Sequence, residues 1–268
     1  MLNVLAKKFG EWVHLTEAEM AAIARLPGTR LSLARGDDPF AQIPCANHAM
    51  LLLEGWAAEY KDRSTGRRVI VELLLPGDMS RLGPAEMNDV SVGTVMLSPG
   101  RVLLVPLASI GEILRHDAVA TALQWAEFVR ESVRREWIVN IGSRKAAARL
   151  AHLLCELCVR MTNVALCENG VCELPLTQAD LADALCISDV HLNVAIQKLR
   201  KSGMVQLAGK RLRILNWQGL AETAEFDDDY LHHHPVPGRQ IGYPLVTKSS
   251  VKRHQDEAVR LIAGAYRR

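Results

Sequence analysis

The 268-residue chain has few cysteines, little net charge and no long apolar run. Six cysteines are too few for a disulfide framework at this length, so we interpret all of them as reduced thiols. Apolar runs such as 50–53 and 69–75 are too short to cross a membrane, and the N-terminus lacks the segments of a signal peptide. These absences predict a soluble, cytoplasmic protein that does not contact the membrane.

Catalytic and metal-binding motifs are also scarce. The sequence contains no HExxH, no Walker loop, no Gly-x-Ser-x-Gly and no pair of carboxylates at a persuasive spacing. Cys155, Cys158, Cys167 and Cys172 form a cluster that a metal could use, but small apolar residues in a packed helix and loop explain them better. The histidines 232–234 fit a solvated linker. We therefore predict no enzymatic activity, no metal ligand and no cofactor.

Positive charge is unevenly distributed, although the formal net charge is only +2. The segment 190–215 contains no Asp or Glu, and its basic residues are Lys198, Arg200, Lys201, Lys210, Arg211 and Arg213. Such a segment attracts phosphates. This part of the chain is therefore the candidate for nucleic-acid binding.

The first half of the chain is rich in β-strand signals. From 31 to 107, short β-prone runs alternate with turn residues such as 36–39, 76–78 and 98–100, a pattern typical of an antiparallel sandwich or roll. A short helix, 17–26, precedes them. Because 268 residues exceed the usual size of one domain, we expect a second domain further along the chain.

A long amphipathic helix is predicted after residue 115. Its apolar residues recur three or four positions apart and are Val119, Leu123, Ala126, Val129, Val133, Trp137 and Ile141. Such a helix is longer than a small domain needs for its own core, so we expect this stripe, with Leu123 and Val133 at its centre, to form a dimer contact. The alternative is that the helix packs lengthwise on its own β domain.

Two short capped helices and a basic hairpin follow a further helix at 144–161. Thr177 and Asp180 form a capping-box pattern, and Ser188 is a second N-cap before a helix that ends at Gly203. Alternating residues at 211–215, after a turn at 208–210, predict a two-stranded wing. Helix, turn, helix and basic wing in this order predict a winged helix-turn-helix.

The second of these helices has one apolar and one polar face. Leu192, Ala195, Ile196 and Leu199 share the apolar face, so the opposite face is free to enter the major groove of DNA. The candidate DNA-binding residues on the two helices and the wing are Thr177, Gln178, Ser188, Asp189, Val190, His191, Asn193, Val194, Gln197, Lys198, Lys201, Lys210 and Arg211.

These features together resemble the Crp/Fnr family of transcription regulators, over about Leu31 to Leu231. The resemblance is carried by the segments LLLEGWAAEY, GRRVIVELLLPGD, SRKAAARLAHLLCEL, LPLTQADLADAL, VHLNVAIQKLRKSGMV and GKRLRIL. It implies a β-roll sensor domain like those that bind cyclic nucleotides, a long dimerisation helix and a second helix that reads DNA.

The sequence departs from the family pattern at functional positions. The region 91–95 lacks the arginine that holds the phosphate of a cyclic nucleotide, and no cysteine before Cys45 could hold an iron–sulfur cluster. Val194 replaces a base-reading arginine, and Cys186 replaces a glycine of the turn. Cyclic AMP is therefore not the expected effector, and the effector stays unassigned.

The predicted fold is α+β, with a β-roll sensor domain at 1–115, a dimerisation helix at 116–141, a winged helix-turn-helix at 142–231 and a flexible tail at 232–268. The predicted function is transcription regulation by a homodimer on a palindromic operator in double-stranded DNA, with RNA polymerase as a candidate partner. The alternative is a dimeric sensor or partner-binding protein whose winged helix has lost specific DNA recognition, for which Val194 is the best support.

Overall fold

The computed structural model describes residues 3–41, 47–64, 66–82 and 91–231, which all belong to one compact unit of the chain, 1–237. Two expectations, the flexible tail at 232–268 and a reduced thiol at Cys45, lie outside the described residues. Within the described part of the chain, no helix is both long and apolar enough to cross a bilayer.

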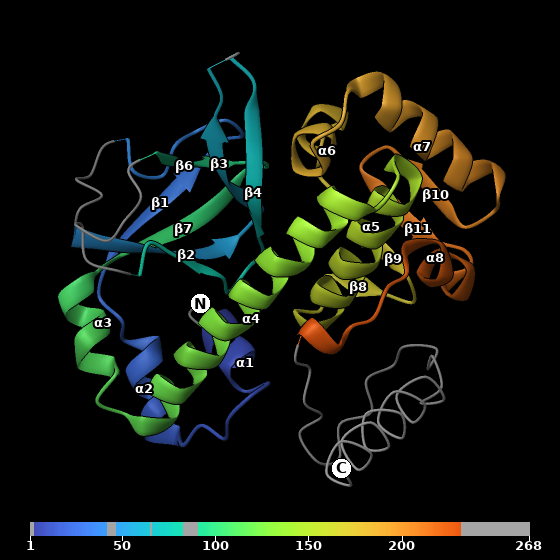
Figure 1. Cartoon of the computed structure of the whole chain (residues 1–268). Helices are drawn as coiled ribbons and strands as arrows, with labels where there is room; N and C mark the ends of the chain where they lie inside the picture. The colour runs from blue at the N-terminus through green and yellow to red at the C-terminus, as the bar shows by residue number, and fades with distance from the viewer. Residues whose placement is uncertain (1–2, 42–46, 65, 83–90, 232–268) are drawn as a thin grey trace, which may run out of the picture. The chain divides into compact units, whose positions relative to one another are not determined.

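The first half forms two antiparallel sheets, as the sequence predicts (Figure 1). One sheet has the order β1-β7-β2-β5 and the other the order β4-β3-β6. The strands are β1 (Thr29–Leu33), β2 (His48–Glu54), β3 (Ala57–Asp62), β4 (Arg68–Leu74), β5 (Met79–Ser80), β6 (Val92–Met96) and β7 (Gly100–Pro106). Apolar side chains from both sheets fill the interior, among them Met50, Leu52, Leu74 and Met96.

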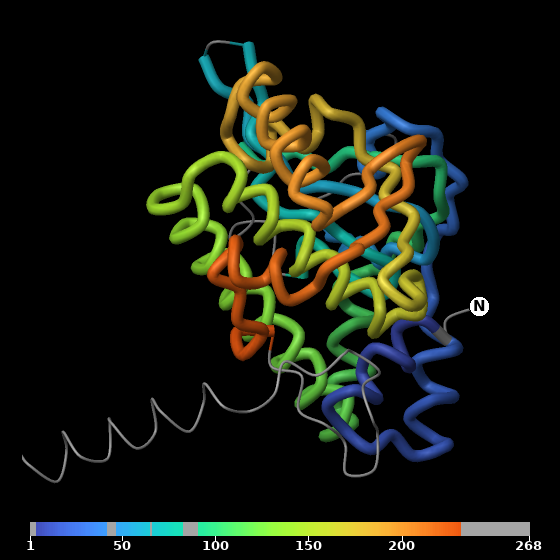
Figure 2. Tube along the Cα trace, turned by 90° about the vertical axis from the view of Figure 1, so that its right-hand side faces the viewer, coloured from blue at the N-terminus to red at the C-terminus, as the bar shows by residue number. Residues whose placement is uncertain are grey.

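Two short helices and a longer one pack beside this β region. Helix α1 (Asn3–Phe9) and helix α2 (Glu17–Ala24) contribute Leu5, Phe9 and Ile23 to a second apolar core. The first turns of α4 (Asp117–Ser143), which follows α3 (Leu107–Ile113), complete this core. Figures 1 and 2 both show α1 close to α4.

The predicted long helix is confirmed, and part of its apolar stripe packs inside the same chain. Helix α4 continues past Ile141 to Ser143 and spans 27 residues. Val119, Val133 and Trp137 are buried within the same chain, and the Trp137 indole donates to Glu156 at 2.9 Å. Leu123, Ala126, Val129 and Ile141 of the same stripe are half-buried. The buried part of the stripe therefore serves the chain's own core, as in the alternative stated above.

The second half contains helices around a small sheet. Helix α5 (Ala146–Asn163) is buried along most of its length and packs on α7 and α8. The other elements are β8 (Cys167–Glu168), β9 (Val171–Glu173), α6 (Gln178–Leu185), α7 (Asp189–Lys201), β10 (Val205–Ala208), β11 (Arg211–Ile214), α8 (Trp217–Ala224) and the 3-10 helix η3 (Asp229–Leu231). The predicted two-stranded wing, β10 and β11, is half of a four-stranded sheet with the order β10-β11-β9-β8.

The expectation that all cysteines are reduced is wrong for one pair, because Cys167 and Cys172 form a disulfide. They are direct partners on the adjacent strands β8 and β9, with Cα atoms 4.4 Å apart. Asn169 and Gly170 between them both have positive φ, as a tight hairpin turn requires. The Asn-Gly pair in the sequence is the signal that could have predicted this hairpin and thereby the pairing.

Candidate nucleic-acid interface

Side-chain caps build the helix-turn-helix. The Thr177 hydroxyl accepts from the backbone N–H of Asp180 at 3.1 Å, and the Asp180 carboxylate accepts from the N–H of Thr177 at 2.7 Å. Helix α6 ends at Cys186 in the left-handed conformation, with φ 52°. Ser188 then caps α7 through the N–H of His191. Both predicted N-caps are confirmed, and cysteine takes a conformation for which glycine is better suited.

Helix α7 buries one face and exposes the other, as its sequence pattern predicts. Leu192, Ala195, Ile196 and Leu199 are buried. On the opposite face, Val190 and Val194 are 71% and 64% exposed. The remaining predicted residues of this helix and its cap, other than the half-buried Ser188, are also exposed: Asp189, His191, Asn193, Gln197, Lys198 and Lys201.

The exposed face of α7 can make two kinds of contact with a nucleic acid. Asn193, Val194, Gln197, Lys198 and Lys201 border an open hollow along the helix. Amides can form paired hydrogen bonds with adenine, and a valine can contact a thymine methyl group. The lysines in the last turn can reach phosphates.

The wing places positive charge on a hairpin turn beside this helix. Strands β10 and β11 pair through Val205 to Ile214, and the turn between them contains Gly209 and Lys210, both with positive φ. Lys210 and Arg211 are exposed, whereas Leu212 of the same strand is buried. Because side chains alternate between the two faces of a strand, the basic side chains lie on the outer side of the sheet, as predicted.

Two arginines of the β region bind the first helix of the motif, and the sequence did not predict them. The buried carboxylate of Asp180 pairs with Arg35 at 2.5 Å and with Arg68 at 2.6 Å, and Arg68 also pairs with Asp183 at 3.0 Å. Arg35 lies 3.4 Å from the Thr177 hydroxyl as well. Thr177 is therefore shared between the helix cap and the β region, whereas Gln178 is exposed. Nothing in the local sequence signals these pairs, because their residues are more than 100 positions apart.

The β region has a small charged cavity against α4. The cavity has a volume of about 60 Å³, and its lining includes Lys8, Asp78, Arg130 and Arg160. The Asp78 carboxylate pairs with both Lys8 and Arg160. Burial, together with the positive charge of Arg160, lowers the pKa of Lys8 to about 7. The volume suits a few water molecules rather than a nucleotide, since ligand pockets are typically several hundred Å³.

Comparisons with known proteins agree on the type of protein. The family model for the Crp-like helix-turn-helix domain matches residues 148–223. The transcriptional activator protein FnrL of Cereibacter sphaeroides is 27% identical over 190 residues, which cover 66% of this chain and 73% of FnrL.

Solved structures share the fold over most of the chain. FixK2 from Bradyrhizobium japonicum matches with a TM-score of 0.64 at 23% identity, and covers 74% of this chain and 98% of FixK2. A CooA mutant from Carboxydothermus hydrogenoformans matches with a TM-score of 0.60 at 13% identity, and covers 79% of this chain and 92% of CooA. The predicted α+β fold is confirmed.

Proposed function

Because this chain is a DNA-binding transcription regulator of the Crp/Fnr family, we propose that it acts as a homodimer that reads a palindromic operator with α7 of each subunit. The observation that carries the proposal is the exposed face of α7, on which two valines and two amide side chains lie opposite the buried apolar face of the same helix. On this face an amide can form paired hydrogen bonds with adenine, and a valine can contact the methyl group of thymine.

The proposed contacts divide into phosphate contacts and base contacts. Thr177 and Gln178 at the start of α6, Ser188 at the cap of α7, and Lys198, Lys201, Lys210 and Arg211 are assigned to phosphates. Asp189, Val190, His191, Asn193, Val194 and Gln197 are assigned to base edges in the major groove. The basic groups attract the whole duplex, while the second group distinguishes one sequence from another.

Helix α4 provides the surface for the second subunit. A row of exposed or half-buried residues on this helix alternates three and four positions apart, the spacing of a two-helix seam: Trp125, Phe128, Ser132, Arg135 and Val139. Phe128 and Val139 are about half exposed, and the neighbouring Ile138 is 72% exposed. We assign this surface, which we call the α4 seam, to a second copy of the chain, in place of the buried stripe expected at first.

The proposal also assigns a role to each part of the chain, a protein partner and a cellular compartment. The β region with α1 to α3 is the sensor domain, α4 joins the subunits and residues 142–231 read DNA. The effector is not assigned. RNA polymerase is the partner beyond DNA, and the cytoplasm is the compartment in which we expect the protein to work.

Selection from random duplex DNA by the full-length protein, repeated over a series of salt concentrations, tests the proposal. We expect a palindrome whose half-sites lie about one helical turn apart, with affinity that falls steeply as salt rises. Selection of no preferred sequence would instead support the alternative of a sensor or partner-binding protein with a degenerate winged helix, which is favoured by valine in place of a base-reading arginine at position 194.

A further inference from the structure

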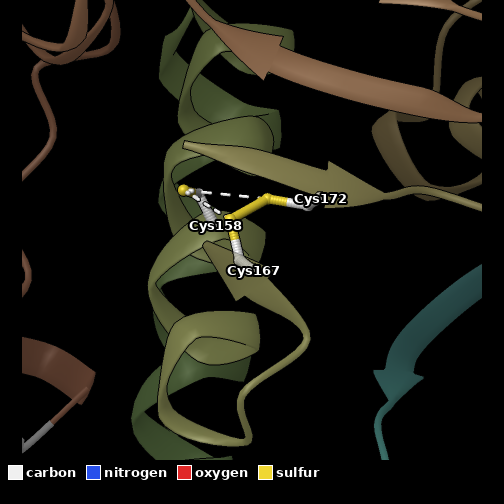
Figure 3. A group of neighbouring side chains, drawn as sticks. All are labelled: Cys158, Cys167 and Cys172. Atoms are coloured by element: carbon white, nitrogen blue, oxygen red, sulfur yellow. Dashed lines mark hydrogen bonds between the residues drawn. A yellow bond between two sulfur atoms is a disulfide. The ribbon is translucent and has the colours of Figure 1, made fainter. Parts of the chain in front are cut away.

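Three cysteine sulfurs meet in the core of the DNA-binding half (Figure 3). The Sγ atom of Cys158 on α5 lies 3.5 Å from that of Cys167 and 4.0 Å from that of Cys172, which are joined in the disulfide. All three residues are at least 93% buried. A disulfide that only staples a hairpin does not need a third thiol beside both of its sulfurs, so Cys167 has two possible disulfide partners, Cys172 and Cys158.

The disulfide borders a large groove through which a reagent can approach. The groove has a volume of about 940 Å³, and Cys167 and Cys172 line it together with Trp56 of the β region and Lys210 and Arg211 of the wing. Cys158 is not among its lining residues. A small dithiol therefore reaches the disulfide first, from the side where the wing lies.

The buried third thiol is unreactive while the disulfide is closed. Burial raises the pKa of the Cys158 thiol to about 11, so the thiol is protonated at neutral pH and is a poor nucleophile. The bond between Cys167 and Cys172 is thus stable until an external thiolate opens it.

The disulfide is also directly connected to the wing. Cys172 is the register partner of Leu212 on β11, and Glu173 is the partner of Arg211. The N–H of Leu174 donates to the carbonyl of Lys210 at 2.8 Å. The strand that carries one sulfur therefore supports, by backbone hydrogen bonds, the two basic residues proposed to bind phosphate.

We propose that Cys158, Cys167 and Cys172 form a redox site whose pairing state sets the strength with which the wing binds DNA. A dithiol gives two electrons and two protons to the Cys167–Cys172 bond, which yields two protein thiols and a cyclic disulfide of the reductant. After reduction, re-oxidation can join Cys158 to Cys167 in place of Cys172: an oxidant such as diamide takes up two electrons and two protons from the two thiols, the Cys158–Cys167 bond forms, and Cys172 stays a thiol. The coupling to DNA rests on the proposed function, whereas the thiol chemistry does not.

Peptide mapping of the full-length protein tests the chemistry. In a Cys45→Ser, Cys186→Ser background, reduction with dithiothreitol should open the Cys167–Cys172 bond. In the same background, Cys172→Ser oxidised with diamide should form a Cys158–Cys167 disulfide. Cys155→Ala, which removes another buried thiol of α5, is the matched control and should keep both reactions. If the Cys172→Ser protein keeps the parent's circular dichroism but forms no Cys158–Cys167 disulfide, the second pairing is overturned. If the serine variant does not fold, Cys172→Ala repeats the test.

The DNA dissociation constant of each form tests the coupling. Since the disulfide restrains the strand beside the wing, reduction should weaken binding to the selected operator about fivefold or more, and the Cys167→Ser, Cys172→Ser double variant should lose this response. Equal affinity of both forms overturns the coupling and leaves the proposed function intact. If the reduced protein retains zinc, and its affinity for the operator depends on whether zinc is bound, the redox assignment is overturned. If neither form binds DNA, the proposed function and the coupling both fail, while the mapping still decides the chemistry.

Discussion

Arg130 of α4 donates to both carboxylate oxygens of Glu72 on β4, with Nε–Oε1 at 2.7 Å and Nη2–Oε2 at 2.8 Å. Glu72 is opposite Glu59 on β3, and Arg134 bonds both carboxylates, at 2.7 and 3.2 Å. Burial raises the pKa of Glu72, but the charge and hydrogen bonds of Arg130 outweigh this effect, so its pKa lies below the ordinary value. The pair therefore connects the long helix to the β region as buried ions.

Arg130→Met should lower the free energy of unfolding by about 3 kcal/mol, because Glu72 would be left buried with only the half-exposed Arg134 as a partner. Urea unfolding measures the loss. Arg101→Met is the matched control: Arg101 also holds a glutamate, Glu54, through two nitrogens, but both side chains are exposed. Its unfolding midpoint should stay close to that of the parent. Equal effects of the two variants would contradict the buried ion pair.

His152 should make stability fall as the solution becomes acidic. Burial and, to a smaller extent, the positive charge of Arg144 lower the pKa of His152 to about 3. The ring lies against Phe226 and Tyr230, and its Nε2 is 3.1 Å from a Glu136 carboxylate oxygen. Since the unfolded chain binds the proton more readily, stability is fully present above about pH 6.5 and is lost progressively as pH falls toward 3.

His152→Leu should therefore reduce the slope of unfolding free energy against pH in this window by up to about 1.4 kcal/mol per pH unit. Urea unfolding at a series of pH values measures the slope. His14→Gln replaces an exposed histidine and should leave the slope unchanged. An unchanged slope in His152→Leu would show that the buried ring is not responsible.

The α4 seam predicts a dimer that surface charges disrupt. Phe128→Glu with Val139→Glu should give folded monomers, because two acidic side chains on each helix would face those of the partner. Sedimentation measures the mass and circular dichroism the fold. Met20→Glu, a similarly exposed apolar residue on α2, should leave the dimer intact. A parent protein that is monomeric at micromolar concentration would sink this prediction.

DNA binding should separate into a phosphate part and a base part. Lys210→Ala with Arg211→Ala should weaken all sequences alike and flatten the salt dependence by roughly one unit per lost phosphate contact. Asn193→Ala or Gln197→Ala should weaken the free energy of binding by about 1 to 3 kcal/mol on the selected operator and by little on random DNA.

Val194→Arg should shift the base preference toward guanine at one position of each half-site. Gln218→Ala, exposed on α8, is the control. If the wing and helix variants lose affinity in the same way, the division is wrong.

Cyclic AMP should not bind in the micromolar range. The segment 91–95 supplies no arginine, and apolar side chains fill the interior between the two sheets. Arg81, the nearby arginine before this segment, donates to the Val92 carbonyl at 2.7 Å and stacks on Phe40. Calorimetry measures binding directly. Saturable binding accompanied by tighter DNA binding would contradict the prediction.

The sequence by itself determined the order of elements and the two faces of α7. Both depend on local chemistry: Thr177 and Ser188 cap their own helices within three residues, and the helical period alone places Val190 and Val194 opposite Leu192 and Ile196. The wing likewise follows from alternation over a few residues and a glycine turn. Because these interactions join residues only a few positions apart, the sequence pattern alone predicts them.

The tertiary structure decided which surfaces are buried and which distant groups meet. The apolar stripe with Val133 and Trp137 looked like a dimer seam because periodicity identifies a buried face but not what buries it. No local sequence motif predicts the ion pairs of Asp180 with Arg35 and Arg68. The same holds for the approach of Cys158 to the hairpin disulfide. Such contacts form only when separate elements dock, since the free energy that selects them comes from packing across the whole core.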